Sequence, residues 1–243
     1  MRLSYFFCFL FMGCVHFSFP QTASSELNTL SDRAASRARK VYVDFFHEQM
    51  QLYNGTKYDE VLRNPEIDRG HRFFLTENLI HGDIQYGGVA YSDVQLQYDI
   101  VTDQIITVLP NTSYKISLIK NLVSEFILQD HRFIHLEDKG IASGFYEILL
   151  DGKIKVFVKR TKRISESYYN HNLFVKRNYS EKNELYVLVD KTFYLIKGKK
   201  SLQQIFNYNK QDFSAAIRYV NTSFKREKEQ YVVQFVEFYN NLN

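Results

Sequence analysis

The chain has 243 residues, a formal net charge of +4 and an aromatic content of 16%. With only 10 glycines and 3 prolines, its composition excludes collagen-like, low-complexity and intrinsically disordered classes. A chain of this length can bury a sizeable core in one large domain without disulfide bonds.

The first 20 residues are typical of a secretory signal peptide. Arg2 precedes a short apolar run over residues 3–15, and a polar exit follows at Ser18–Ala23. The run is shorter than the roughly 20 apolar residues that a membrane-spanning helix needs. We therefore expect cleavage near Pro20, export to the periplasm or the outer-membrane surface, and no transmembrane span in the mature chain.

The two cysteines, Cys8 and Cys14, both lie inside the apolar run. Cleavage after the run leaves a mature chain that forms no disulfide and offers no thiolate metal ligand. The alternative is lipidation of Cys14, because residues 11–14 loosely resemble a bacterial lipobox. Gly13 fits that pattern, whereas bulky Met12 does not, so we prefer plain cleavage.

The mature chain, residues 21–243, is expected to form a single α+β domain that begins with a helix. Ser31 or Asp32 can cap a helix that runs to about Gln51, and apolar residues recur there at helical spacing. Residues 41–46 of this segment could also form a strand. Asn54–Gly55 then turns the chain.

A long β region follows, over about residues 73–197. The strongest hairpin signal is Asp151–Gly152, flanked by alternating apolar residues. We expect strands at residues 94–100, 105–108, 126–136, 146–150, 153–159, 185–189 and 192–196. Strands at this spacing predict a curved antiparallel meander, which could be a barrel, a half-barrel or a sandwich.

The last part of the chain, about residues 201–242, is predicted to be helical. Residues 201–206 form a short helix, and apolar stripes at residues 211–219 and 228–242 are wide enough to pack on a sheet face.

Charge is distributed unevenly along the chain. Residues 41–150 hold 8 Lys/Arg against 16 Asp/Glu, a net of −8, and residues 151–210 hold 14 against 5, a net of +9. One interpretation is that the two halves neutralise each other, with the basic residues on solvent-exposed faces. The other is a basic face for an anionic envelope lipid or glycan. The residues predicted for such a face are Lys155, Lys159, Lys162 and Arg163.

Motifs for catalysis are weak. His131 and His135 are four residues apart, a spacing that lets two histidines bind one metal ion on a helix. The segment is predicted to be a strand, however, and residues four apart along a strand lie about 13 Å from each other. Ser143 lacks the glycine-flanked nucleophile elbow. Three carboxylates could pair in space, namely those of Asp99, Asp103 and Glu125. We expect no metal, no cofactor and no nucleic-acid partner.

Tyrosines could line a sugar- or lipid-binding cleft, but tyrosines in strands more often fill a core or a cross-strand pair. The residues concerned are Tyr86, Tyr91, Tyr98, Tyr168 and Tyr169.

Several short segments together resemble a known family. The segments Leu52–Gly55, Gly70–Phe74 and Val94–Asp99, followed by Gly144–Glu147 and Phe238–Leu242, are similar in order to a family of uncharacterised exported proteins of Bacteroidota-type bacteria. The resemblance implies a location in the cell envelope and no catalytic activity.

These patterns favour an exported envelope protein that binds a partner or has a structural role without catalysis. A more specific form of this hypothesis is lipid or lipoprotein handling, and it is based on the fold class alone. The alternatives are an envelope glycan hydrolase that uses paired carboxylates, and an adaptor of an outer-membrane complex.

Overall fold

The computed structural model describes residues 37–38, 50–59, 68–169, 174–206, 213–214 and 216–242. The chain divides into two units, residues 1–47 and residues 48–243. In the first unit only residues 37–38 are described, and both are helical. The helix predicted up to Gln51 therefore lies largely outside the described residues. Every strand of the described chain belongs to the second unit.

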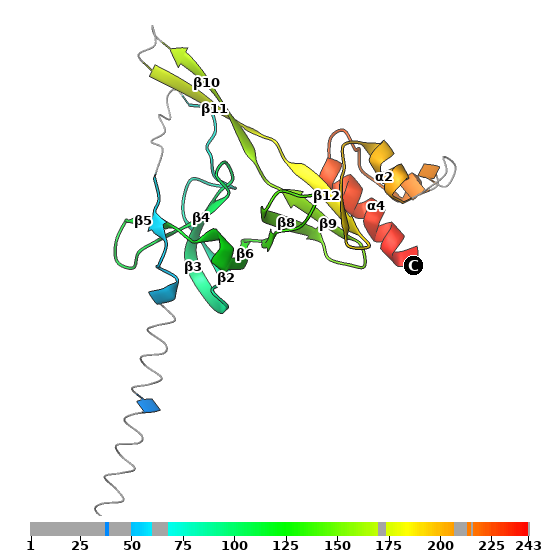
Figure 1. Ribbon diagram of the computed structural model, residues 1–243. Coiled ribbons are helices and arrows are strands. Elements are labelled where there is room, and N and C mark those ends of the chain that lie inside the picture. The colour runs from blue at the N-terminus through cyan, green and yellow to red at the C-terminus, as the bar shows by residue number, and fades with distance from the viewer. Residues whose placement is uncertain are drawn as a thin grey trace, which may run out of the picture. The chain divides into compact units, whose positions relative to one another are not determined.

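An antiparallel sheet of 11 strands dominates the second unit (Figure 1). The strand order is β1-β5-β4-β3-β2-β6-β7-β8-β9-β12-β13, and β10 and β11 pair separately. The strands are β1 (Thr56–Lys57), β2 (Ile80–Tyr86), β3 (Val89–Asp99), β4 (Gln104–Val108), β5 (Lys115–Ser117), β6 (Val123–Leu128), β7 (His131–Leu136), β8 (Gly144–Leu150), β9 (Lys155–Lys159), β10 (Lys162–Tyr169), β11 (Phe174–Glu181), β12 (Glu184–Val189) and β13 (Thr192–Leu195). Because β1 and β13 are edges that do not pair with each other, the described sheet is open, and the predicted meander does not close into a barrel.

Tight turns with positive φ join many of the neighbouring strands. Asp190 and Lys191, between β12 and β13, have φ values of 47° and 64°, as a two-residue hairpin turn requires. Gln129, between β6 and β7, has a φ of 53°. The single strand predicted over residues 126–136 was therefore wrong, because this turn divides the segment into an antiparallel pair.

The helices lie towards the C-terminus. They are α2 (Lys199–Ile205), a 3-10 turn η2 (Ile217–Tyr219) and α4 (Lys228–Leu242), and a second 3-10 turn, η1 (Lys120–Leu122), precedes β6. The long helix α4 occupies the range that its apolar stripe predicts, and it contacts β8 and β9. No helix among the described residues is both long enough and apolar enough to cross a bilayer.

Two large apolar cores and two smaller clusters pack on the sheet in the described part of the chain. Strands β2 to β8 contribute the first core, which includes Tyr98, Phe126 and Phe133. The second core lies between the helices and the face of β9 that carries Val156 and Val158. Phe157 points to the opposite face of β9, as the alternation along the strand predicts.

An ion-pair bridge attaches α4 to the sheet. The Arg160 guanidinium lies 2.5 Å from Glu147 on β8, through Nε, and donates two further hydrogen bonds of 2.6 and 2.9 Å to Glu229 near the start of α4. The Glu147 side chain is only 4% exposed, so Arg160 compensates a buried negative charge. The second carboxylate oxygen of Glu147 contacts the His131 imidazole.

Candidate functional site

Strand β3 is longer than its neighbour β4, and this difference creates the candidate site. On one side β3 pairs with β2 along its N-terminal part, from Val89 to Leu96. On the other side it pairs with β4 only over Leu96–Asp99. Over residues 89–95, the described part of the chain therefore supplies no strand on that second side.

The chain leaves the sheet after β4 because of its local sequence. Pro110 has no backbone N–H and a fixed φ, and Asn111 has a φ of 58°. The Thr112 N–H donates to the Leu109 carbonyl at 3.1 Å, which closes a turn. This turn carries the backbone away from β3 before a longer ladder can form.

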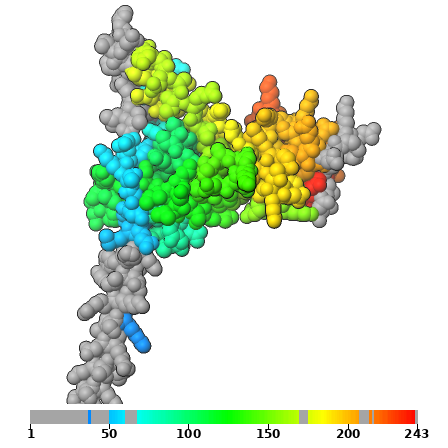
Figure 2. Space-filling model, viewed as in Figure 1, coloured from blue at the N-terminus to red at the C-terminus, as the bar shows by residue number. Residues whose placement is uncertain are grey.

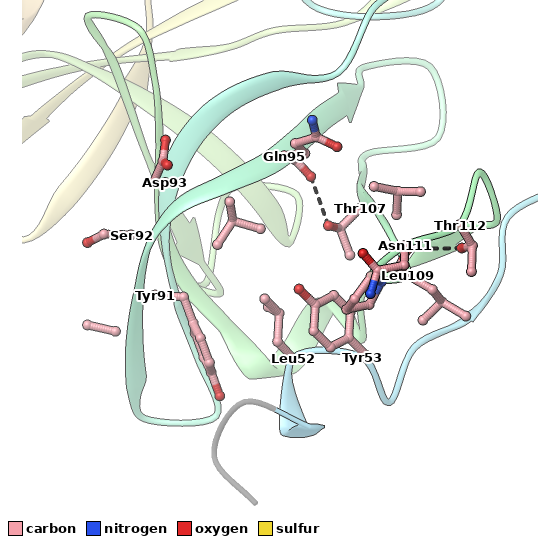
Figure 3. A pocket seen from close by; sticks show the side chains of 14 residues that line it. Leu52, Tyr53, Tyr91, Ser92, Asp93, Gln95, Thr107, Leu109, Asn111 and Thr112 are labelled. Atoms are coloured by element: carbon pink, nitrogen blue, oxygen red, sulfur yellow. Dashed lines mark hydrogen bonds between the residues drawn. The ribbon is translucent and has the colours of Figure 1, made fainter. Parts of the chain in front are cut away.

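A cavity of about 380 Å³ lies along the uncovered part of β3. We call it the β3 slot; its lining comprises residues 52–53, 90–95 and 107–112. Figure 3 shows Leu52, Tyr53 and Tyr91 near one end and Leu109 and Asn111 across from β3. The Thr107 hydroxyl donates to the Gln95 carbonyl at 2.8 Å, where the ladder with β4 begins.

A β-bulge shapes β3 beside the slot. The register with β2 shifts between Gly82 and Ile84, so that Ser92 and Asp93 stand opposite a single residue. Asp93 has a φ of 59°, and its N–H donates to the Asp83 carboxylate at 3.1 Å. A bulge increases the local twist of a strand, which helps turn this half of β3 away from β4.

The groups in the slot suit binding better than catalysis. The lining offers backbone groups, hydroxyls and amides, and Asp93 is its only ionisable carboxylate. That carboxylate lies 2.7 Å from the His81 imidazole, on β2. Within the described residues, no group of three His, Cys, Asp or Glu side chains could hold a metal ion.

The carboxylates of the predicted hydrolase alternative each have a cationic partner. Asp99 is fully buried, with its Oδ2 2.7 Å from Arg72 Nε. Glu125 accepts two hydrogen bonds from Arg132, at 2.9 and 2.8 Å. Asp103 lies 2.8 Å from Lys159 and 2.5 Å from Lys120.

Asp103 also has an electrostatic environment that opposes a role as a general acid. Burial alone raises the pKa of its carboxyl, but the Lys159 charge and hydrogen bonds from Lys120, Lys159 and Tyr98 outweigh burial and lower the pKa below its usual value. Burial, together with the Asp103 charge, raises the pKa of the Tyr98 hydroxyl well above its usual value. A general acid needs a raised carboxyl pKa at neutral pH.

Replacing Asp103 by asparagine is expected to lower the free energy of unfolding by about 3 kcal/mol at neutral pH, because two lysines lose their shared carboxylate. The folded-state pKa of Asp103 lies below the ordinary value of 3.8, so this stabilisation is present above that value and is lost as the pH falls through the folded-state pKa. Urea unfolding of both proteins, at about pH 7 and about pH 2, should show the difference closing in acid. A difference that persists at low pH contradicts the ion-pair explanation.

The four residues of the predicted basic face have different surroundings. Lys155 pairs with Asp151, and Lys159 is buried at 8% exposure against Asp103. Lys162 donates to the Phe73 carbonyl at 2.7 Å, and Arg163 is exposed. Lys162 and Arg163 follow the strand that was predicted to end at residue 159, and they begin a further strand, β10, because the chain continues into a second hairpin ladder.

The remaining residues singled out from the sequence serve mostly in packing. His135 contacts the Phe145 ring, with centroids 5.3 Å apart, and burial lowers the pKa of its imidazole. Ser143 is exposed just before β8. Tyr86, Tyr91 and Tyr98 belong to the first core, whereas Tyr168 is 70% exposed. The side chain of Tyr169 lies outside the described ones.

Comparison of the chain with protein-family models, with curated proteins and with solved structures finds no match. The resemblance to exported proteins of Bacteroidota-type bacteria stays a prediction. The β3 slot was not predicted from the sequence; its signal is Pro110–Asn111, which ends β4 early beside a long alternating β3.

Proposed function

We propose that this protein is an exported, non-catalytic binding protein of the cell envelope that takes an extended polypeptide segment into the β3 slot as an added strand. The observation that carries the proposal is that β3 has no described strand partner over residues 89–95 on the side of the cavity. This stretch is roughly 23 Å long at the rise of an antiparallel strand. It is long enough to pair with several residues of a partner chain.

Strand addition fits the chemistry of the slot. A peptide that pairs with a sheet edge gains affinity from main-chain hydrogen bonds, and pockets beside the edge select its side chains. The floor formed by Leu52 and Tyr53 offers apolar contact, and the wall at Asn111 and Thr112 offers polar groups. An acyl chain fits less well, because it offers no hydrogen-bonding groups to the edge of a strand.

The adaptor role is therefore the form of the proposal that the geometry favours. The hydrolase alternative has less support, because the carboxylates predicted for it lie in ion pairs, and the pKa of Asp103 is lowered. An added strand would extend an existing sheet and needs no change in the described fold.

The test uses the mature protein and a probe peptide selected from a phage-displayed library of random peptides about 12 residues long. Amide hydrogen exchange should become slower in residues 89–95 when the probe binds, and should stay unchanged in residues 96–99, which already pair with β4. Two copies of the probe, each N-methylated on a different one of the two alternating sets of residues, test whether the probe binds as an added strand. In an antiparallel pair, alternate N–H groups point to the neighbouring strand, so one copy should lose binding and the other should keep it.

Equal effects of the two methylated probes, or protection elsewhere in the sheet, would overturn strand addition at β3.

The intact mass of the same preparation, purified from its native envelope, tests whether the protein is exported and where it is cleaved. A mass that begins after about residue 20 supports simple export, and one that begins at an acylated Cys14 supports an anchored form.

A further inference from the structure

Strands β9 to β12 form one long hairpin. In the strand register Lys159 stands opposite Glu184, and Lys162 stands opposite Glu181. The register therefore continues without a break from β9–β12 into β10–β11. At the junction the Lys182 N–H donates to the Thr161 carbonyl at 2.8 Å. We call the outer part, strands β10 and β11 with the junction residues Thr161 and Lys182, the arm; Figure 1 draws β10 and β11 as a two-stranded ribbon apart from the main sheet.

The inner face of the arm carries the residues that contact the segment at residues 68–73. On this face Lys162 donates to the Phe73 carbonyl. Arg177 pairs with Glu166 at 3.0 Å, and its guanidinium lies 4.0 Å from the buried Asp68. The cations of the inner face therefore have partners within the protein.

The outer face of the arm has a different composition. Because side chains alternate along a strand and cross-strand partners share a face, the described side chains of this face are Thr161, Arg163, Ser165, Ser167, Lys176, Asn178, Ser180 and Lys182. None of them is acidic or apolar, and most are exposed. In the described part of the chain, the ion pairs of the arm are those of Arg177 on the inner face. On the side seen in Figure 2, residues of the arm, in yellow-green, lie at the surface.

We propose that the outer face of the arm docks on the anionic headgroups of a membrane surface. Its three cations, Arg163, Lys176 and Lys182, supply the attraction. The hydroxyl and amide groups between them can donate hydrogen bonds to phosphate oxygens. The described side chains of this face are polar or positively charged, as contact with headgroups requires.

A membrane fits this face better than an acidic glycan does. Binding sites for single ligand molecules are concave, and four cavities of the described chain have no outer-face residue in their lining. A two-stranded ribbon can present the three charges of one face to a planar surface. The face is also separate from the β3 slot, so the two proposals can fail independently.

The experiment is sedimentation of the mature protein with vesicles of phosphatidylcholine alone or mixed with phosphatidylglycerol. The wild type should bind the anionic vesicles, and should bind them much more weakly as the salt rises from about 0.05 M to about 0.5 M. The variant R163E/K176E/K182E should lose about a hundredfold in affinity. The matched control K139E/K153E/K200E makes the same change of net charge at exposed lysines outside the arm, and should stay within about fivefold of the wild type.

Equal losses in the two variants would show that net charge alone drives binding and would overturn the proposal. Equal binding of the wild type to both kinds of vesicle would do the same, and so would displacement of the protein from vesicles by soluble alginate at low concentration, which would point to an acidic glycan. Thermal melts check that each variant folds. If the glutamate variant unfolds, R163Q/K176Q/K182Q replaces it, with an expected loss of about tenfold.

Discussion

Replacing Gly144 by alanine is expected to lower the free energy of unfolding by about 3 kcal/mol or more. Gly144 has a φ of +152°, and a Cβ at this position would overlap both Lys159 Nζ and Asp103 Oδ2. To make room, the buried ammonium must move away from the carboxylate, which leaves both charges poorly compensated. Chemical denaturation of the purified variant measures the loss.

Gly140 provides the matched control for this change. It also has a positive φ, of +100°, but a Cβ there would meet nothing within 4 Å. Gly140→Ala therefore measures the backbone cost alone, which we expect to be about 1 kcal/mol. Similar losses at the two positions would show that the backbone conformation, and not the ion pair, explains the effect at Gly144.

Replacing Arg160 by methionine should also destabilise the protein by about 3 kcal/mol, because it removes the charge that compensates the buried Glu147. The same guanidinium attaches the start of α4 through Glu229. We therefore expect the variant to exchange the amide hydrogens of α4 faster than those of the first core. Its unfolding midpoint should also be lower than that of the wild type.

Arg132 serves as the control for Arg160. Its side chain is 46% exposed and it pairs with Glu125 near the surface, so Arg132→Met should cost less than about 1 kcal/mol. If the two variants lose equal stability, the burial of Glu147 does not determine the contribution of Arg160.

Several strands of this fold follow from local patterns in the sequence, whereas β2, β10 and β11 were not predicted. In β9, Val156 and Val158 alternate with Lys155, Phe157 and Lys159, and the structure places the two valines in the second core. Such alternation needs only neighbouring residues to be recognised. The turn at Gln129 was missed because neither it nor Asp130 stands beside a glycine or proline, which mark most turns.

The surroundings of the charged residues could not be derived in this way. Lys159 reads as an exposed cation in the sequence, but its partner Asp103 lies 56 residues away. Charge counting cannot find such a partner, because the ion pair depends on how the fold brings β9 to the turn between β3 and β4. For the same reason, the free cations of the arm became distinguishable from the paired ones only with the register of β10 and β11.

The β3 slot depends on a difference between two strand lengths, and strand ends are the least certain part of any interpretation of a sequence. The residues that end β4, Pro110 and Asn111, are visible in the sequence. The part of β3 that they leave uncovered depends on the register between β3 and β4.

The strand order also bears on how the chain folds. From β6 to β9 each strand pairs with the next one along the chain, and β12 completes the hairpin that β9 begins. Contacts of this kind close short loops, which favours rapid folding. Two other pairings join strands that are not consecutive along the chain. β2 pairs with β6, and β1 pairs with β5, where Gly55 passes so close to the Ser117 carbonyl that a side chain would not fit. We therefore expect the β1 edge to join the sheet last, after the strands that come later in the chain have paired.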